Sequence, residues 1–382
     1  MSFKPKKHVM LSKMESVYRT DPVPTGAANA ILIANPKLTP LIQSTVDRAV
    51  LKPYLGNHGK VIAGGHVGLD YDVEMAGAGS AGSAPGYGPL LKGCAMAEKI
   101  NAADVTGTAQ AGAAGTITLA AAASAVDDAY QYFRISIDGG TGAGQSGVIR
   151  SYNGTTKVAT MYEDWSTAPD VTSTYTIHAQ VAYTTVSAGE QSRASYFNID
   201  GLQHTMLGVL SDMSLKLPKS AIPMFSFKDI GIYATPTDTS MPAATLTGFQ
   251  YPKAVNQANT TGTLHGYAAI FSDISLQLGN VISYSNMMNS EKISFTGRKP
   301  AGSVTFEHPT ISAKDFYSIA EAATPGALNV VHGTAAGHRV GVYCPAVQLT
   351  NPTDQNDVHR MLGMSLDVQP VDGNDEMILT VY

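Results

Sequence analysis

Charged side chains are scarce in this chain. Asp, Glu, Lys and Arg make up 14% of its 382 residues, against about 25% in an average globular protein. A solvated monomer of this size normally carries more charge, so the deficit indicates a surface that other protein copies cover. The formal net charge of −5 argues against a protein that grips nucleic acid, because phosphate binding requires clustered Lys and Arg. It does not exclude a protein that DNA slides past.

Cysteine and long apolar runs are also lacking. Cys94 and Cys344 are far apart and have no CxxC partner or neighbouring His, so neither a zinc site nor a disulfide framework is indicated. No stretch approaches the roughly 18 uninterrupted apolar residues of a membrane helix. The basic N-terminal segment MSFKPKKHVM is not followed by the apolar core of a signal peptide. We therefore expect a protein without membrane contact that is assembled in the cytoplasm.

The motifs that could indicate an active site or a binding site lack the surrounding sequence that such sites need. Gly142–Gly147 matches GxGxxG, but the following GVIRSYNG predicts a strand and a hairpin turn, whereas a dinucleotide site needs a helix there. His204 and His359 begin the same pentapeptide pattern, HxMLG, which favours a shared structural role over a single active site. Asp372–Glu376 lacks the spacing of an EF-hand loop and predicts a polar turn. We expect no catalytic residue, no cofactor and no metal.

Glycine and period-two patterns dominate what the chain does contain. The 37 Gly accompany short runs of Ser, Thr, Val and Ile, which is typical of β-rich proteins with many turns. Val67, Leu69, Tyr71 and Val73 alternate with Gly and acidic residues, which predicts a strand with one buried face. A helix is expected from Pro89 to Glu98 because its apolar residues share one face.

The same order of patterns recurs later in the chain. VISYSNMMNSEKISFTGRKPAG predicts a hairpin, SVTFEH an alternating strand and AKDFYSIAEAA a short helix. The HxMLG segments at 204–208 and 359–363 strengthen the repeat. The two alternating strands, which contain Leu69 and Val304, are further apart along the sequence than the two HxMLG segments are. An insertion of about 80 residues in the first copy would explain this difference. The sequence therefore predicts a duplicated β core with an insertion in its first copy.

The inserted block has a composition of its own. Its expected strands are YFRISI, GVIRSY, KVATMYED and TYTIHA, and Asn153-Gly154 is a strong hairpin signal. We interpret it as a small all-β domain. The expected division is 1–104 and 183–235 for the first core copy, 105–182 for the inserted domain, 236–263 for a linker, and 264–382 for the second copy.

The N-terminal part of the chain resembles a known family. Residues 15–32 (ESVYRTDPVPTGAANAIL), 51–57 (LKPYLGN) and 64–98 (GGHVGLDYDVEMAGAGSAGSAPGYGPLLKGCAMAE) closely resemble the tail tube proteins of long-tailed, non-contractile bacteriophages. The resemblance implies a β-sandwich or barrel core, each copy with a short flanking helix, and an inserted domain on the tube exterior. It also implies a structural protein of the virion, assembled in the bacterial host, that polymerises into stacked rings around a channel for genome DNA.

The resemblance implies partners as well. These are further copies of the chain, a tape measure protein, and the tail terminator and distal tail proteins, while DNA passes without specific binding. Two core copies per chain favour a trimeric, pseudo-hexameric ring, with a hexameric ring as the alternative, because closed rings need identical contacts that close.

Loops and one sheet face provide candidate contact residues. Ring stacking is expected from the N-terminal arm at residues 4–10, the loop 47–60 and its counterpart 283–302, each of which could instead be a mobile surface loop. The candidates for inter-ring contact are Lys6, Lys7, Asp47, Arg48, Lys52, Tyr54, Arg298 and Lys299. A channel for DNA should be net negative, because a basic wall would bind phosphates. The candidates for this lumen are Asp70, Asp72, Glu74 and Glu307.

Another class of protein fits part of the same sequence. In a virion-surface binding module, the inserted β domain would recognise a glycan or receptor and the duplicated core would be a spacer. Such a protein would not polymerise. An enzyme would instead require a clustered set of carboxylates or a Ser/His/Asp set, and the sequence offers none.

Overall fold

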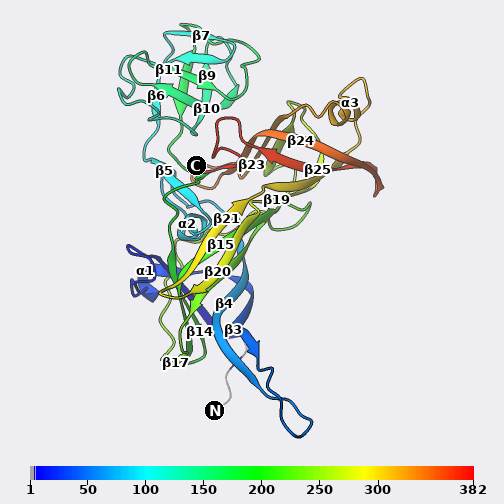
Figure 1. Ribbon diagram of the computed structural model, residues 1–382. Helices are drawn as coiled ribbons and strands as arrows, with labels where there is room; N and C mark the ends of the chain where they lie inside the picture. Colours follow the sequence, from blue (N-terminus) through cyan, green and yellow to red (C-terminus); the bar gives the residue numbers. More distant parts are fainter. Residues whose placement is uncertain (1–3, 5) are drawn as a thin grey trace.

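The computed structural model describes residue 4 and residues 6–382, and it is mainly β, as expected (Figure 1). Pro5, within the expected N-terminal arm, lies outside the described residues, as do residues 1–3 of the first core copy. The helices of the described part are short. They are α1 (Gly26–Asn29), α2 (Gly88–Lys92) and α3 (Phe316–Glu321).

The first half of the core is a run of antiparallel strands. They pair in the order β3·β4·β16·β15·β14·β1. Their bounds are β1 (His8–Met14), β3 (Ala34–Asp47), β4 (Lys60–Glu74), β14 (Arg193–Ile199), β15 (Leu202–Lys216) and β16 (Met224–Tyr233).

The second half repeats this order of pairing as β19·β22·β25·β24·β23·β18. The bounds are β18 (Thr260–Leu264), β19 (Phe271–Gln277), β22 (Ala301–Glu307), β23 (Gly326–His332), β24 (Val340–Asn356) and β25 (Arg360–Gln369). The order along the chain matches too, with α2 following β4 and α3 following β22. Two halves of the same connectivity agree with a duplicated core, whose exact boundaries stay a prediction.

One part of the sequence repeat does not match this correspondence. The pairing order equates β15 with β24 and β16 with β25, but the two HxMLG segments lie on β15 and at the start of β25. His204 and His359 are therefore not at equivalent positions. A five-residue pattern was too short to identify corresponding strands among several that carry the same alternation.

The two halves are joined edge to edge within the chain. The end of β15 pairs with β19, with Ser214 opposite Gln277 and Lys216 opposite Ser275. One continuous sheet therefore runs through β3, β4, β16, β15, β19, β22, β25 and β24. Among the described residues, this sheet does not close on itself within a single chain.

The hydrophobic core lies behind this sheet. The period-two expectation for β4 is confirmed, since Val67, Leu69, Tyr71 and Val73 are all at most 2% exposed. They pack with residues of β16 and with α2. The expected helix at 89–98 is only partly correct, because α2 ends at Lys92 and Met96–Asn101 forms strand β5. Pairing of β5 with β13 (Gln180–Thr185) outweighs the helical pattern there.

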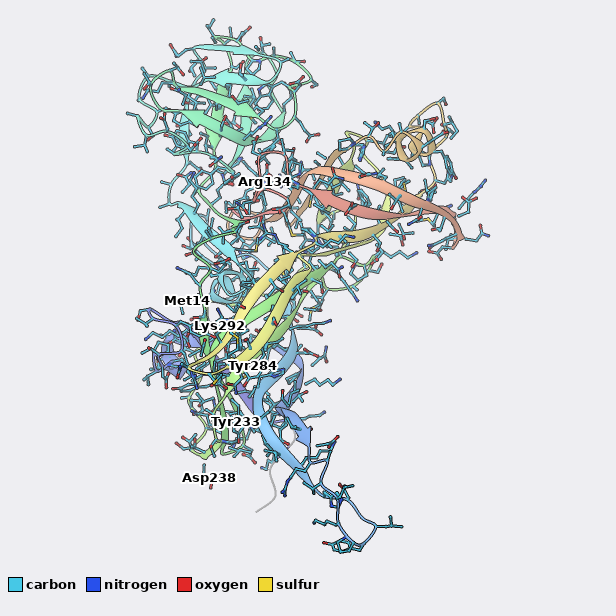
Figure 2. The ribbon with its side chains drawn as sticks, in the orientation of Figure 1. Met14, Arg134, Tyr233, Asp238, Tyr284 and Lys292 are labelled. Atoms are coloured by element: carbon cyan, nitrogen blue, oxygen red, sulfur yellow. The ribbon has the colours of Figure 1, made fainter. Side chains whose placement is uncertain are left out.

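The expected hairpin after β19 is confirmed. Strands β20 (Asn280–Met287) and β21 (Ser290–Arg298) form it, and it folds back across β15 and β16 of the first half. Its Ile293 packs with Leu210 and Ile232, and the Tyr284 hydroxyl accepts a hydrogen bond from Gly65 N at 3.2 Å. Figure 2 shows Tyr284 on this hairpin, alongside the first half.

The remaining short strands complete the core and the connection between its halves. They are β2 (Ala30–Ile31), β17 (Thr237–Asp238) and β26 (Ile378–Val381), the last of which pairs with both β13 and β24. The linker expected at 236–263 contains little regular structure before its last residues, which form β18 and pair with β23.

The inserted block has its own sheet and core. Its strands pair only with one another and surround buried residues that include Phe133, Tyr152 and Trp165. They are β6 (Val105–Thr108), β7 (Ala111–Ala113), β8 (Thr116–Thr118), β9 (Arg134–Gly139), β10 (Ser146–Asn153), β11 (Val158–Met161) and β12 (Thr174–Ile177). The hairpin signalled by Asn153-Gly154 is confirmed, but its loop runs to Lys157, which adopts a φ of 61°.

Removing the inserted block should leave the core folded. The block leaves the core after β5 and returns at β13, where Asn101 lies directly opposite Gln180. We expect a variant with residues 102–179 replaced by Asn-Gly, a favoured hairpin turn, to keep a cooperative melting transition. It should lose about 2 kcal/mol of stability because Tyr343 and Ile378 lose their apolar cover. Circular dichroism melting measures this loss, and a variant without β-sheet signal would contradict the prediction.

Candidate assembly surfaces

One face of the continuous sheet is polar outside the area that the β20–β21 hairpin covers, where Leu210 and Ile232 pack against Ile293. Side chains that point away from the core alternate with buried ones such as Leu69, and directly opposed residues on neighbouring strands share a face. One row consists of Asp212 on β15, Lys228 on β16, Asp70 on β4 and Lys37 on β3. We call this surface the polar face.

The polar face continues into the second half through the β15·β19 junction. Ser214 lies opposite Gln277, which lies opposite Ala301. Carboxylates outnumber lysines on this face. The carboxylates are Asp70, Asp72, Glu74, Asp212, Asp273, Glu307 and Asp367, and the lysines are Lys37, Lys216 and Lys228. Burial raises the pKa of Asp212 and of Asp273.

The four lumen candidates from the sequence all lie on the polar face. Asp70 is exposed, while Asp72, Glu74 and Glu307 are half-buried. Asp72 accepts hydrogen bonds from Ser226 Oγ at 2.6 Å and Asn35 Nδ2 at 2.9 Å. The structure therefore brings these candidates to one surface.

The β3–β4 hairpin forms a projecting arm. Its end extends beyond the rest of the chain, opposite the inserted block (Figure 1). We define the arm as residues 42–62. Leu51 and Leu55 are fully exposed, at 102% and 103%, and Tyr54 is 63% exposed. Lys52 Nζ lies 5.5 Å from the centre of the Tyr54 ring. Such a concentration of exposed apolar side chains marks a contact site.

The arm holds the inter-ring candidates of the first half. Asp47 and Lys60 lie opposite each other where the loop of the arm begins, with their charged atoms 3.4 Å apart. Arg48, Lys52 and Tyr54 are exposed in the loop beyond them. The structure thus places these candidates together at one end of the molecule.

The other inter-ring candidates have different surroundings. Lys6 is exposed, and Lys7 Nζ binds Asp200 Oδ1 at 2.6 Å, which holds the pKa of Asp200 below its usual value. Lys299 is exposed. Arg298, however, is engaged within the chain, where it donates to Val186 O at 2.9 Å and to Glu376 at 3.1 Å. Because its guanidinium is paired with Glu376, Arg298 does not offer a free charge to another ring.

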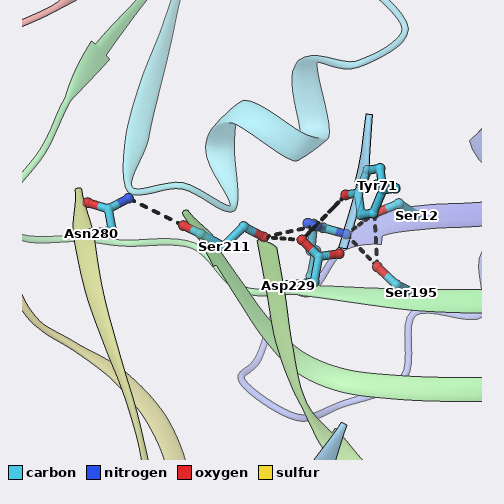
Figure 3. Close-up of polar contacts among 7 residues, drawn as sticks. Ser12, Tyr71, Ser195, Ser211, Asp229 and Asn280 are labelled. Carbon is cyan, nitrogen blue, oxygen red and sulfur yellow. Dashed lines mark hydrogen bonds and ion pairs between the residues drawn. The ribbon is translucent and has the colours of Figure 1, made fainter. Parts of the chain in front are cut away.

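A buried ionic network lies inside the first half (Figure 3). Arg193 on β14 and Asp229 on β16 are fully buried, and Arg193 Nη2 donates to Asp229 Oδ1 at 2.6 Å. The guanidinium also donates to Ser12 Oγ at 3.0 Å and to the Tyr71 hydroxyl at 3.0 Å, and Ser211 Oγ donates to Asp229 at 2.7 Å. The network links β1, β4, β14, β15 and β16.

The two opposite charges of the network stabilise each other in their ionised forms. Burial has the largest single effect on the pKa of Arg193 and acts to lower it, but the attractions of Asp229 and Tyr71 and the hydrogen bond to Asp229 together raise the pKa above its usual value. Burial also raises the pKa of Tyr71 and of the Cys94 thiol. No sequence pattern pointed to this pair, because its residues lie on strands that are separated along the chain by other elements.

The motifs weighed for chemistry take structural roles. Gly142–Gly147 lies in the turn between β9 and the start of β10, as the sequence indicated. Asp372–Glu376 is the predicted turn, in which Asp372 binds Arg150 and Asp375 accepts from Tyr162 at 2.9 Å. Within the described ranges, no group of three or more His, Cys, Asp and Glu could hold a metal ion. The helices found there are too short to cross a membrane.

Comparison with protein families identifies the class of protein. A family model for phage tail tube proteins matches residues 6–381, nearly the whole chain. The chain therefore belongs to the phage tail tube protein family. It is a structural component of the phage tail whose family self-assembles into a tube. No curated protein matches the chain. The family resemblance of the N-terminal segment is thus confirmed, and the long-tailed, non-contractile type stays a prediction.

Proposed function

We propose that the chain forms trimeric, pseudo-hexameric rings that stack into the tail tube of a long-tailed, non-contractile phage, with genome DNA passing through the bore. The observation that carries this proposal is the continuous sheet through both halves of one chain, joined at β15·β19. Each chain supplies two consecutive wall segments of the same connectivity. Three chains then make a six-fold-like wall whose contacts are identical and close.

The polar face supports the passage of DNA along this wall. Its carboxylates outnumber its lysines, and its other residues include the uncharged Ser214, Gln277 and Ser303. A surface of this kind repels phosphates weakly and binds none tightly, because tight binding needs clustered cations. We therefore propose that the polar face, with Asp70, Asp72, Glu74 and Glu307, lines the bore.

The arm supports ring stacking. It presents Leu51, Tyr54 and Leu55 to solvent, beyond the end of the sheet. We propose that it contacts the next ring, together with Asp47, Arg48, Lys52 and the exposed Lys6, Lys7 and Lys299. Arg298 is not included in this set because its guanidinium forms an ion pair with Glu376.

The inserted block fits the outside of such a tube. It is attached through β5 and β13, which do not contribute to the polar face. Its Arg134 reaches the second half, where Nε donates to Thr380 Oγ1 at 2.9 Å and Nη2 to Asn329 Oδ1 at 3.0 Å (Figure 2). We propose residues 105–182 as an accessory exterior domain, 1–104 with 183–235 and 264–382 as the two tube domains, and 236–263 as their connection.

The remaining partners are proposed from the family resemblance of the N-terminal segment. We propose that the tube assembles in the host cytoplasm and that its partners are a tape measure protein and the tail terminator and distal tail proteins.

Electron microscopy of the purified protein tests the proposal. We expect rings or tubes with a central bore, three-fold symmetry in projection, and a bore lined by the polar face in a reconstruction that resolves side chains. Six-fold symmetry would replace the trimer with a hexamer. Uniform monomers at high concentration over a range of salt, or a bore lined by Lys and Arg, would contradict the proposal.

A further inference from the structure

The junction inside the chain is a pairing of two sheet edges. At its end β15 has β16 on one side and β19 on the other, and β19 has β22 beyond it. Ser214–Lys216 pairs antiparallel with Ser275–Gln277. The last strand of the first half is thereby joined to the first strand of the second.

The corresponding strands at the two ends of the sheet have unpaired edges. The pairing order equates β24 with β15 and β3 with β19. Beyond Val347, β24 pairs only with β25 among the described residues, and Asn351–Asn356 is exposed. Strand β3 pairs only with β4 among the residues that the structure describes. Unpaired edges of this kind are templates for another strand.

The register of the first half fixes which residues correspond. Val73 and Phe306 are the last core residues of β4 and β22 before the short helices. The residue four positions before Val73 is Leu69, and the residue four positions before Phe306 is Gly302. Leu69 lies opposite Leu38, and Gly302 lies opposite Leu276. Leu38 in β3 therefore corresponds to Leu276 in β19.

The same counting identifies the segment of β24. Val73 lies opposite Phe225, which lies opposite Leu215. Phe306 lies opposite Leu362, which lies opposite Asp354. Asp354 therefore corresponds to Leu215.

We propose that Thr353–Gln355 of one subunit pairs antiparallel with Lys37–Thr39 of the next, in the register that Ser214–Lys216 and Ser275–Gln277 adopt inside the chain. The proposal rests on the proposed function and names the contact that closes the ring. Thr353 would lie opposite Thr39, and Gln355 opposite Lys37, on the polar face. The contact joins two different edges, so it runs head to tail and closes a ring instead of a two-fold dimer.

The chemistry of the two edges allows this pairing. Residues 353–355 and Lys37 and Thr39 are exposed, and Leu38 is half-buried. Gln355 and Lys37 place one charge opposite an uncharged partner, so no like charges meet. Thr353–Gln355 lies beyond the part of β24 that pairs with β23 and β26, and Lys37–Thr39 pairs only with β4 among the described residues. One edge of each segment is therefore free to pair with another strand.

Disulfide cross-linking of assembled full-length protein tests the register. In a Thr39→Cys, Thr353→Cys variant, opposed Cα atoms of antiparallel strands come within disulfide range. We expect mild oxidation to give covalent dimers and trimers on a non-reducing denaturing gel, with the trimer as the largest closed product. The native Cys94 and Cys344 are fully buried and do not compete.

Matched variants separate the register from other causes. Ser214→Cys, Gln277→Cys reproduces the junction inside the chain and should give an intrachain disulfide without covalent oligomers. Thr39→Cys, Asn351→Cys shifts the register and should cross-link far less. Equal cross-linking of the shifted pair, or rings in the microscope without any cross-link from the Thr39 and Thr353 pair, would overturn the register while the tube proposal stands. Absence of rings from the parent protein would overturn both.

Discussion

Replacement of Asp229 by Asn should destabilise the folded chain by about 3–5 kcal/mol, because it leaves the guanidinium of Arg193 as an uncompensated buried charge. Both side chains are completely buried, and Asp229 accepts the 2.6 Å hydrogen bond from Arg193 Nη2. Asn has nearly the same shape as Asp, so the loss reports on charge and not on a cavity. Urea unfolding below the concentration at which the protein polymerises measures it.

Two further variants check the cause of this loss. Asp70→Asn removes an exposed carboxylate from the neighbouring strand β4, and its effect should stay within about 0.5 kcal/mol. The double variant Arg193→Met, Asp229→Leu removes both charges and should be more stable than Asp229→Asn alone. If Asp229→Asn unfolds at the same urea concentration as the parent, the network does not stabilise the first half as inferred.

Shortening the arm should abolish stacking and leave single rings. Asp47 lies opposite Lys60, so residues 48–59 can be replaced by an Asn-Gly turn that closes the hairpin. The variant loses the exposed Leu51, Tyr54 and Leu55, whose burial between rings we expect to drive stacking. Electron microscopy should show rings with few tubes, while the melting temperature stays close to that of the parent.

Point substitutions refine this test. Leu51→Ser, Leu55→Ser should shorten tubes strongly, and Tyr54→Ala should weaken stacking more than folding. The matched control is Val126→Ser, Val171→Ser, which replaces two similarly exposed apolar residues, 67% and 65% exposed, on the inserted block. Normal stacking by the arm variants, or unfolding of the Tyr54→Ala monomer, would contradict a role of the arm in stacking.

Local patterns predicted much of the fold. Alternation in β4 identified a buried face correctly, and turn residues located the hairpins at 153–154 and after β19. These features depend on residues close in sequence. The helix at 89–98 was overestimated, because its second half is a strand that is stabilised by β13, a segment about eighty residues further along the chain.

The assembly surfaces were predictable only in part. Acidic residues on alternating positions placed Asp70, Asp72 and Glu74 on one face, since that depends only on the period of a strand. The β15·β19 junction and the Arg193–Asp229 pair could not be inferred, because each depends on which distant strands become neighbours. The same reason explains Arg298, whose partner Glu376 is supplied by the turn before β26.

The two corresponding hairpins of the chain differ in position, and this difference would limit how the proposed rings can be oriented on one another. In each chain the first hairpin projects as the arm, whereas the second is folded against the first half. A wall of six similar segments would then carry arms only at alternate segments. A ring rotated by one segment relative to its neighbour would direct every arm at a segment of the wrong kind. If the proposed trimeric rings form, the duplication would therefore halve the number of rotational settings at which each new ring can be added.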